Sequence, residues 1–414
     1  MAVLVLFQCA KGEMRNASAN HRRIHLRERM LSGHKSCVTL GVIDAAASNI
    51  TIRHCREQHI YLFETSVASQ PSVLIRIVGP KTIFTGFAKS VNERMQVFSY
   101  PTPYIGSYHA FVRLLMDDVP DNDVRQACMS TTPTVQHQFQ VDSSTLLTRD
   151  HDHYCCWETN DTFENDWMQY ANVLDQADKM TQRYSNISFN FPMLSDDTLS
   201  QCFINATACF FGDSQMRNLH NSIGKLKYKD KNDIPPELNA KIHTSTNLTT
   251  VFPGLKIKFT FMAFPNLSSL AAGAPELDYC THNFYNFGQW PLGWPEGFPW
   301  SFQKLDTELN NFLSVVKQKA GLHHWVSTAP HPITYMQTSC PPTDWRILTH
   351  IDTFNERARS IIMSNHPTVA YVDTFHPMLH MHDFSFDNAH YQEPVGPDIA
   401  RYVLSTVCPA NTAL

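Results

Sequence analysis

The sequence predicts a two-part α/β protein, in which a doubly wound, mostly parallel sheet follows a smaller β-sandwich. Two observations lead to this fold class. Short β-rich runs separated by turn signals fill residues 60–116, and from residue 201 onward strand-like runs alternate with helical ones. Such alternation is typical of a parallel sheet with helices on both faces, and 414 residues are enough for more than one domain.

The chain is predicted to consist of four segments. A leader and irregular segment spans residues 1–57, a β-sandwich 58–120, a linking segment 121–200 and the sheet domain 201–414. The sandwich is predicted from four runs with turn residues between them: "IYLFETSV", "SVLIRIVG", "RMQVFSY" and "SYHAFVRLLM". The stretch "YIGSYHAFVRLL" resembles immunoglobulin-like and filamin-like modules, in which a Gly-x-Tyr turn leads into an alternating strand.

The sheet domain begins with a buried strand, "ATACFFGD", which runs into the helical stretch "SQMRNLHNSIGKL". Two further strands are "LKIKFTFMAF" and "YCTHNFYNFGQ", and the apolar residues between Leu305 and Val316 lie on one helical face. "HWVSTAP" is strand-like, and a helix with a capping box of Thr353 and Glu356 follows it and stops before "NHP". The strand "VAYVDTF" and the helix "PVGPDIARYVLSTVC" close the domain.

Composition restricts the partners and the compartment. A net charge of −5 without a long basic run gives no electrostatic basis for binding nucleic acid or anionic membranes. No stretch reaches the roughly 18 apolar residues that a transmembrane helix needs. Eleven cysteines without zinc-finger spacing favour disulfides. Together with seven N-x-S/T sequons they predict a protein of the secretory pathway, in the Golgi lumen or outside the cell, that carries N-linked glycans at Asn16, Asn49, Asn160, Asn186, Asn205, Asn247 and Asn266.

The first ten residues, "MAVLVLFQCA", are compatible with the apolar core of a signal peptide. They lack the basic start that usually precedes such a core, so a truncated N-terminus fits equally well.

The stretch "HDHYCCW" offers His151, His153, Cys155 and Cys156 as metal ligands. Adjacent cysteines do not easily reach one tetrahedral ion together, so disulfide partners are favoured and no metal site is predicted. The chain also lacks a dinucleotide-binding glycine turn, a phosphate-binding loop and a zincin helix, and no cofactor is predicted.

Ser214 stands where a strand ends and a helix begins, with helical N–H groups behind it to stabilise an oxyanion. The alternative is that Asp213 or Ser214 only caps the helix. The turn containing Asp387 and His390 favours a nucleophile, because an aspartate three residues before a histidine can hold the imidazole in one tautomer while its other nitrogen faces a serine. A second Asp-x-x-His, at Asp373 and His376, begins inside a strand and is the weaker candidate.

"FFGDSQMRN", "FYNFGQW" and "FDNAHY", in this order, resemble motifs of the SGNH-type acyl-esterases and acyltransferases, which have a three-layer α/β/α fold. The match is nearest to the branch of PC-esterases, trichome-birefringence-like proteins and NXPE C-terminal domains, and it covers residues 200–410. The resemblance implies Ser214 as nucleophile, His390 as general base and Asp387 as its orienting partner. Residues implied at the oxyanion or substrate site are Arg217, Asn286 and, as a candidate for the glycine of the second motif, Gly254.

Each implied site residue also has a plainer interpretation. Arg217 fits a solvated charge on the helix, and Asn286 fits a turn residue next to Gly288. Gln289 stands where the plant branch often has histidine. Three tryptophans interleaved with proline and glycine fit a sugar-binding groove and the packing of a long loop equally well: Trp290, Trp294 and Trp300.

The sequence therefore predicts a secreted or Golgi-lumenal enzyme that moves or removes an O-acyl group, mainly acetyl, on a glycan or another acylated carbohydrate. The acyl donor is undetermined, and transfer and hydrolysis share the acyl-serine step. The alternative is a catalytically inactive, NXPE-like adhesion or binding glycoprotein. The presence of Ser214, Asp387 and His390 in one chain argues against that alternative.

Overall fold

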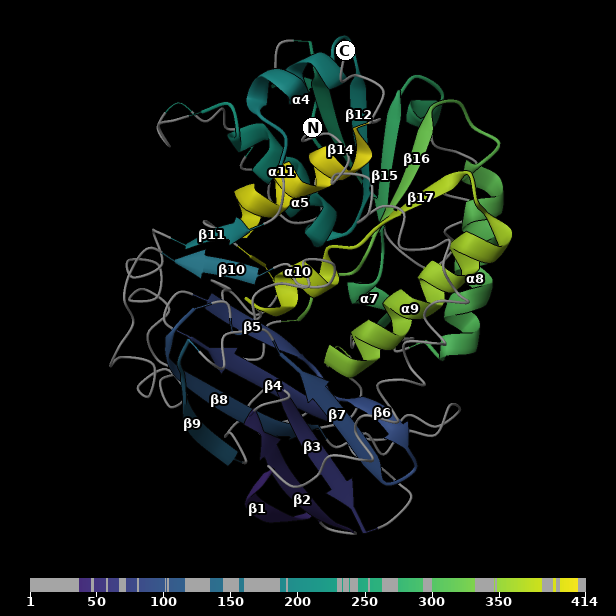
Figure 1. Cartoon of the computed structure of the whole chain (residues 1–414). Coiled ribbons are helices and arrows are strands. Elements are labelled where there is room, and N and C mark those ends of the chain that lie inside the picture. Colours follow the sequence, from purple (N-terminus) through teal and green to yellow (C-terminus); the bar gives the residue numbers. More distant parts are fainter. Residues whose placement is uncertain are drawn as a thin grey trace. The chain divides into compact units, whose positions relative to one another are not determined.

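A computed structural model of the chain divides into two compact units (Figure 1). Unit 1 comprises residues 1–116 and 132–173, and unit 2 comprises residues 117–131 and 174–414. The structure describes residues 37–45, 48–56, 59–66, 72–79, 82–100, 102, 104–115, 135–143, 156–159, 187–190, 193–228, 233, 238, 245–251, 254–262, 275–292, 300–331, 346, 348–381, 390–391 and 395–408.

Unit 1 is a sandwich of two antiparallel sheets. The first has the order β1-β2-β3-β7-β6, with bounds Val38–Ala45, Ser48–Cys55, Ile60–Thr65, Met95–Ser99 and Lys89–Asn92. The second contains β10-β5-β4-β8-β9, with bounds Cys156–Thr159, Thr82–Phe87, Ser72–Val78, Gly106–Leu115 and Val135–Val141. Buried side chains from both sheets form one core, which includes Ile52 and Phe63 of the first and Ile75 and Val112 of the second. The disulfide Cys37–Cys55 lies at the edge of the first sheet.

The strand order of this sandwich is that of immunoglobulin-type domains. From β2 to β9, the two sheets read A-B-E-D and C′-C-F-G. Near the start of β8, the Tyr108 hydroxyl donates to the Tyr104 carbonyl oxygen (2.9 Å) and accepts from the Tyr104 N–H (3.1 Å). A tyrosine that hydrogen-bonds back to the main chain here is the tyrosine corner of immunoglobulin-like sandwiches.

The sandwich strands extend on both sides of the range 58–120. Strands β1 and β2 occupy part of the segment expected to be irregular, and β9 and β10 occupy part of the expected linking segment. The edge strand β1 exposes Val38 and Val42, and β9 buries only Phe139 and Val141. In β1 a register shift between Thr39 and Gly41 also interrupts the alternation. Strand β9 has the sequence VQHQFQV, which does alternate, so its signal was present in the sequence and was missed.

Unit 2 contains a mixed sheet with the order β13-β14-β12-β15-β16-β17. The bounds in that order are Thr249–Thr250, Lys256–Phe261, Thr207–Gly212, His282–Asn286, Leu322–Val326 and Val369–Val372. The pairs from β14 to β17 are parallel, and β13 pairs with β14 antiparallel. The short strand β11 (Ile187–Asn190) precedes helix α4 (Asp196–Cys202) along the chain.

The helices of unit 2 follow its strands in the alternation that the sequence predicts. Those among the described residues are α4 (Asp196–Cys202), α5 (Ser214–Lys225), α7 (Gln289–Leu292), α8 (Phe302–Val316), α9 (Leu348–Asn365), α10 (Phe375–Leu379) and α11 (Val395–Val407), with a 3-10 turn at Pro275–Asp278. The start of α9 differs from the predicted Thr353. Its first turns bury Leu348 and Ile351, and this tertiary packing extends the helix beyond the capping signal.

Aromatic contacts show that helices cover both faces of this sheet. Phe210 stacks on Phe284, with ring centroids 4.8 Å apart, and contacts His220 of α5. On the other face, Tyr285 contacts Phe211 and Phe312, and Phe312 belongs to α8. Successive residues of a strand point to opposite faces, so α5 and α8 lie in different layers. Helix α11 packs on α5, and α9 packs on α8 (Figure 1).

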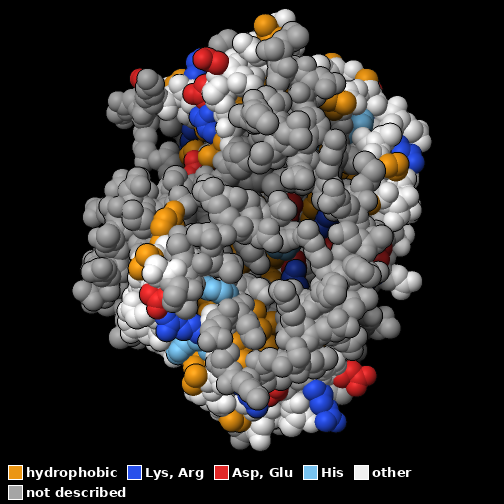
Figure 2. All heavy atoms as spheres, in the orientation of Figure 1, with side chains coloured by type: hydrophobic (Ala, Val, Ile, Leu, Met, Phe, Trp, Pro, Cys, Tyr) orange, Lys and Arg blue, Asp and Glu red, His pale blue; other side chains and the backbone are white. Residues whose placement is uncertain are grey.

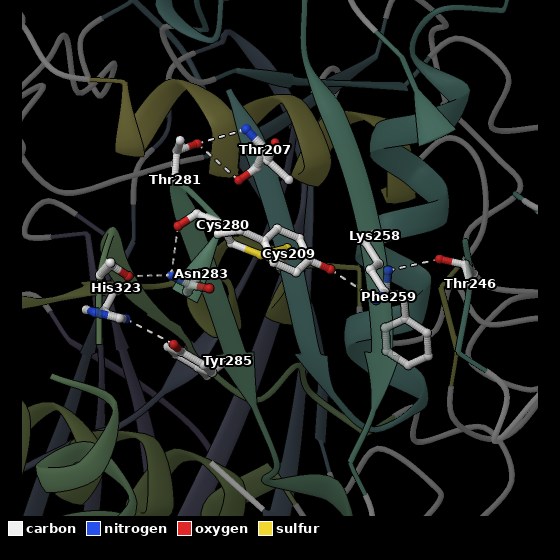
Figure 3. The surroundings of a disulfide bond; sticks show 12 residues. Thr207, Cys209, Thr246, Lys258, Phe259, Cys280, Thr281, Asn283, Tyr285 and His323 are labelled. Atoms are coloured by element: carbon white, nitrogen blue, oxygen red, sulfur yellow. Dashed lines mark hydrogen bonds between the residues drawn. A yellow bond between two sulfur atoms is a disulfide. The ribbon is translucent and has the colours of Figure 1, made fainter. Parts of the chain in front are cut away.

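Disulfides stabilise unit 2 within and outside the sheet. The bond Cys209–Cys280 joins β12 to the residue two positions before β15 (Figure 3). Beside it, the Thr281 hydroxyl donates to the Thr207 carbonyl oxygen and accepts from the Thr207 N–H. The bond Cys202–Cys408 joins the end of α4 to the residue after α11. Disulfide formation was expected, and the structure supplies these pairings.

Two surface properties bear on the partners. On the face drawn in Figure 2, acidic and basic side chains of the described residues are interspersed. Within the described ranges, no helix is long and apolar enough to cross a membrane.

Candidate active site

The strand order of unit 2 defines one edge at which a ligand site is expected. Numbered along the chain, the parallel strands β12, β14, β15, β16 and β17 stand in the order 2-1-3-4-5. The order reverses between β12 and β15, and open α/β sheets bind ligands beyond the carboxyl ends of their strands at such a reversal. The last residues of the two strands, Gly212 and Asn286, are partners in the register.

Gly212 is required by the close approach of these strands. Its φ is +153°, and a Cβ added here would lie 2.0 Å from the Asn286 carbonyl oxygen and 2.8 Å from the Met216 side chain. No other residue fits without displacing backbone. The glycine of Gly-Asp-Ser therefore sets the turn from β12 into α5.

Asp213 is the N-cap of α5, and Ser214 is not. One carboxylate oxygen of Asp213 accepts from the Gln215 N–H at 2.8 Å, and the backbone amides of Met216 and Gln289 also favour its charged form. Asp213 is fully buried, and burial raises its pKa to about 6 against the lowering effects of these amides and of His390. Ser214 is the first residue of the helix and is partly exposed, so its hydroxyl is not used as the cap.

His390 lies at the same edge of the sheet. It is buried, and it is close enough to the Asp213 carboxyl to lower that group's pKa. The next residue, Tyr391, fixes this segment. Its carbonyl oxygen accepts from Asn218 Nδ2 of α5 at 3.0 Å, and its hydroxyl donates to the Pro330 carbonyl oxygen at 2.8 Å.

The members of the predicted triad are not joined by hydrogen bonds among the described residues. No hydrogen bond joins Ser214 to His390 within the described part of the chain, although both stand near Asp213. Catalytic hydrogen bonds are often long in ligand-free structures and shorten when substrate binds. Asp387 lies outside the described residues. The roles of Ser214, Asp387 and His390 therefore remain predictions.

Arg217 and Asn286, which were predicted near the oxyanion, are both buried. Arg217, one turn after Ser214, is buried and is not the solvated charge of its plainer interpretation. Asn286 Nδ2 donates to the Val326 carbonyl oxygen (2.8 Å) and to Thr328 Oγ1 (3.2 Å). These bonds commit both amide hydrogens of Asn286 to bridging β15 and the end of β16.

Gly288 and Gln289 continue this bridge. A Cβ on Gly288 would lie 1.6 Å from Thr328 Oγ1, so the position requires glycine. The side chain of Gln289, which stands where the plant proteins often have histidine, donates to the Ala329 carbonyl oxygen at 2.9 Å. The "NFGQ" stretch thus holds the carboxyl ends of two neighbouring strands together.

The prediction that Gly254 belongs to the oxyanion site is wrong. It precedes β14 with φ +88°, and a Cβ on it would meet the Asn205 N–H and Ile204, residues that precede β12. In a parallel sheet these positions form the amino-terminal edge, opposite to the edge with Ser214. Gly254 therefore serves a turn and has no part in an oxyanion site beside Ser214.

The alternative Asp-x-x-His forms an ion pair. Asp373 Oδ2 is 2.7 Å from His376 Nδ1, and His376 Nε2 is 3.7 Å from Asp352 Oδ1. The flanking carboxylates raise the pKa of His376 to about 9 against the effect of burial. Both ring nitrogens face carboxylates, so this histidine is protonated near neutral pH and is a poor general base.

Most of the tryptophans and possible metal ligands named from the sequence are packed in the protein or lie outside the described residues. Trp300 is buried, and the Lys304 ammonium lies 4.7 Å from its ring centroid, so this tryptophan packs within the protein. Trp294 lies outside the described residues. His151, His153 and Cys155 are also outside them. Within the described ranges, no three His, Cys, Asp or Glu side chains are arranged to hold a metal ion.

The contact of Asn218 with Tyr391 and a set of buried histidines in the sheet were not predicted from the sequence. His282 Nδ1 and His324 Nε2 are 3.1 Å apart, and burial lowers the pKa of His282 to about 4 and that of His324 to about 3. His323 pairs with the Tyr285 hydroxyl at 3.0 Å (Figure 3). The run "LHHWV" signals a strand, but no local pattern shows which histidines are buried in it.

No family model matches the chain, and no curated protein matches it. Among solved structures the chain is similar to one described as the salicylyl-acyltransferase SsfX3 from a tetracycline biosynthetic pathway, at 9% identity, over 91% of this chain and 93% of that chain, with a TM-score of 0.28. A TM-score this low carries no argument about fold or function. The conclusions below therefore rest on the residues of this chain.

Proposed function

We propose that unit 2 is a serine-dependent enzyme that transfers or hydrolyses O-acyl groups, with an SGNH-hydrolase-like fold and an immunoglobulin-like module as unit 1. The observation that carries the proposal is that Asp213, and not Ser214, caps the helix at the turn after β12. Asp213 caps α5, which leaves the Ser214 hydroxyl at the helix start, at the point where the strand order reverses. His390 at the same edge supplies a base.

In the proposed reaction, Ser214 Oγ attacks the ester carbonyl carbon and its proton passes to His390. Backbone N–H groups at the start of α5 stabilise the oxyanion of the tetrahedral intermediate. The ester C–O bond then breaks, the leaving alkoxide takes the proton from His390, and the acyl group remains on Ser214. Water or a sugar hydroxyl attacks this acyl-serine, gives its proton to His390, and the proton returns to Ser214 Oγ as the acyl product leaves.

Other residues are given supporting roles in this proposal. Asp387 orients the imidazole of His390, and buried Arg217 contributes positive charge one helical turn from Ser214. Asn286 positions the carboxyl end of β15 through its bonds to β16. The chemistry proposed requires no cofactor.

The proposed substrate is an acylated carbohydrate of the secretory pathway, with acetyl as the main acyl group. The disulfides Cys37–Cys55, Cys202–Cys408 and Cys209–Cys280 support an oxidising compartment. Three of the seven sequon asparagines are described, and all are exposed: Asn49, Asn205 and Asn247. Exposure at these positions is compatible with N-linked glycans.

A serine-reactive phosphonate probe tests the function. We expect intact-mass analysis to show one adduct on the wild-type protein, none on Ser214→Ala, and an unchanged adduct on Ser314→Ala, a serine on α8. The wild-type protein should also release or transfer acetyl on a panel of O-acetylated glycans in a Ser214-dependent manner. Folded protein without Ser214-dependent labelling or turnover would instead support the inactive binding glycoprotein.

A further inference from the structure

A small cavity lies in unit 2 beneath the turn that carries Ser214. It has a volume of about 50 Å³ and lies among α5, the carboxyl ends of β15 and β16, α10 and α11. Its apolar wall is formed by Met216, Leu219, Val326, Ala329, Met378 and Ile399. Figure 1 shows these helices around the ends of the two strands.

The cavity continues the helical ridge on which Ser214 stands. Residues four apart on a helix lie above one another, so Ser214, Asn218 and Ser222 form one ridge. Asn218 and Ser222 line the cavity together with Gln215 and Met216, the two residues after Ser214, so the cavity begins beside the first turn of α5. Tyr391, the residue after His390, lines it as well.

Several polar groups of the wall are engaged within the protein. Ser327 Oγ accepts from the backbone N–H groups of Thr374 and Phe375, and the Thr374 hydroxyl donates to the Ser327 carbonyl oxygen. The amide of Asn218 donates to the Tyr391 carbonyl oxygen. These bonds occupy much of the polar wall, to which Gln215, Ser222 and Asn286 also belong. The larger part of the lining is apolar, which suits an apolar occupant with few polar contacts.

We propose that this cavity receives the acyl chain of the substrate and limits its length. This inference rests on the proposed function, since it requires an acyl group on Ser214. At roughly 10–15 Å³ for each water-sized atom, a cavity of about 50 Å³ holds about four non-hydrogen atoms beyond the carbonyl. The preferred substrates are then esters of short acyl groups, from acetyl to about pentanoyl. Met378, the side chain that α10 contributes to the apolar wall, is the flexible residue whose truncation would enlarge the cavity.

The test uses p-nitrophenyl phosphonates with ethyl, butyl and octyl chains on the purified full chain. The Ser214 oxygen bonds to phosphorus, p-nitrophenolate leaves, and the serine proton passes to His390. Labelling rates at Ser214 are followed by intact mass. Because a pocket discriminates by about tenfold or more for each misfitting methylene, we expect the octyl probe to react at least about tenfold more slowly than the ethyl and butyl probes.

Two wall variants should change this profile in opposite directions. Met378→Ala enlarges the cavity and should reduce the butyl-to-octyl difference by about tenfold, whereas Ala329→Leu fills it and should slow the butyl probe more than the ethyl probe. Met363→Ala, at an exposed methionine of α9, is the matched control and should keep the wild-type profile. Melting curves identify any variant that does not fold, and the remaining variant then decides.

The outcomes separate this inference from the proposed function. Labelling of Ser214 with equal rates for all chain lengths, or a profile unchanged by the folded wall variants, overturns the acyl-chain cavity and leaves the serine chemistry standing. Absence of labelling by every probe overturns both.

Discussion

The side-chain amide of Asn218 donates a hydrogen bond of 3.0 Å to the main-chain carbonyl oxygen of Tyr391. This bond connects α5, which begins with Ser214, to the segment that carries His390. In the proposed enzyme, Asn218 is a positioning residue that sets the distance between nucleophile and base.

Asn218→Ala should lower kcat by about tenfold, which corresponds to the loss of one hydrogen bond of about 1.4 kcal/mol. KM for an acetyl ester should change less than kcat: Asn218 also lines the proposed acyl cavity, but loss of its bond to Tyr391 displaces the base. The measurement is steady-state kinetics with an acetyl ester. Asn311→Ala, at an exposed position of α8, is the control. Equal loss of kcat in both variants would contradict the positioning role.

Asp213→Asn should change how stability depends on pH. The carboxyl has an ordinary pKa of 3.8, raised to about 6 in the fold by burial. Ionisation is therefore disfavoured in the folded state, so stability falls as pH rises from about 4 to above about 6, by roughly 3 kcal/mol for a shift of this size. Asparagine caps helices about as well as aspartate and does not ionise.

The midpoints of urea unfolding at pH 4 and pH 8 test this prediction. The variant should gain stability relative to the wild-type protein at pH 8 and lose that advantage at pH 4. A stability advantage that is the same at both pH values would show that ionisation of Asp213 does not destabilise the folded state.

The ion pair of Asp373 and His376 should stabilise unit 2 over a limited pH window. The pKa of His376 is raised to about 9 and that of Asp373 is lowered. The histidine contribution is complete below its ordinary pKa of 6.5 and disappears as pH rises through about 9. The aspartate contribution is present above 3.8 and disappears as pH falls through the lowered pKa of Asp373.

His376→Gln should therefore lower the melting temperature at pH 6 and have little effect at pH 10. The side chain is about half exposed, and the loss is expected to stay below about 1 kcal/mol because water screens the pair. Asp352→Asn serves for comparison, because it keeps the closer pair of Asp373 and His376, and it should show a smaller change. If the destabilisation grows toward pH 10, the charged pair is not its cause.

Tyr108→Phe should destabilise unit 1 by about 1–1.5 kcal/mol, since it removes the hydroxyl that bonds twice to Tyr104. Hydrogen exchange at β8 reports this loss locally. Tyr279→Phe, at an exposed tyrosine in unit 2, should leave that exchange unchanged. Unchanged protection of β8 in Tyr108→Phe would remove the tyrosine corner as a stabilising element.

The parts of the fold that the sequence predicts are those with a local signal. The apolar run that ends at Gly212 predicts β12, and the abrupt change at Asp213 predicts the start of α5. The same run also indicates at which edge of the sheet Ser214 lies, because strand ends in an alternating α/β pattern share one edge. Whether Asp213 or Ser214 caps the helix depends on backbone geometry, which the tripeptide does not reveal.

The features that were not predictable depend on residues distant in the sequence. Asn218 and Tyr391 meet only because α11 returns to pack on α5. Gly254 has the residue type of an oxyanion glycine, but the parallel direction of β14 places it at the opposite edge. Strand β1 has exposed valines and a register shift between Thr39 and Gly41, so buried residues do not alternate regularly along it.

The disulfide Cys202–Cys408 has a consequence for how the protein survives damage. The two cysteines are 206 positions apart, so most of unit 2 lies within one covalent ring. In the chain-entropy model, this cross-link stabilises the folded state by roughly 5 kcal/mol, because it restricts the unfolded chain. A protease that cuts once inside this ring opens the backbone without separating the pieces, and both halves of a nicked molecule remain together until a reductant reaches the bond.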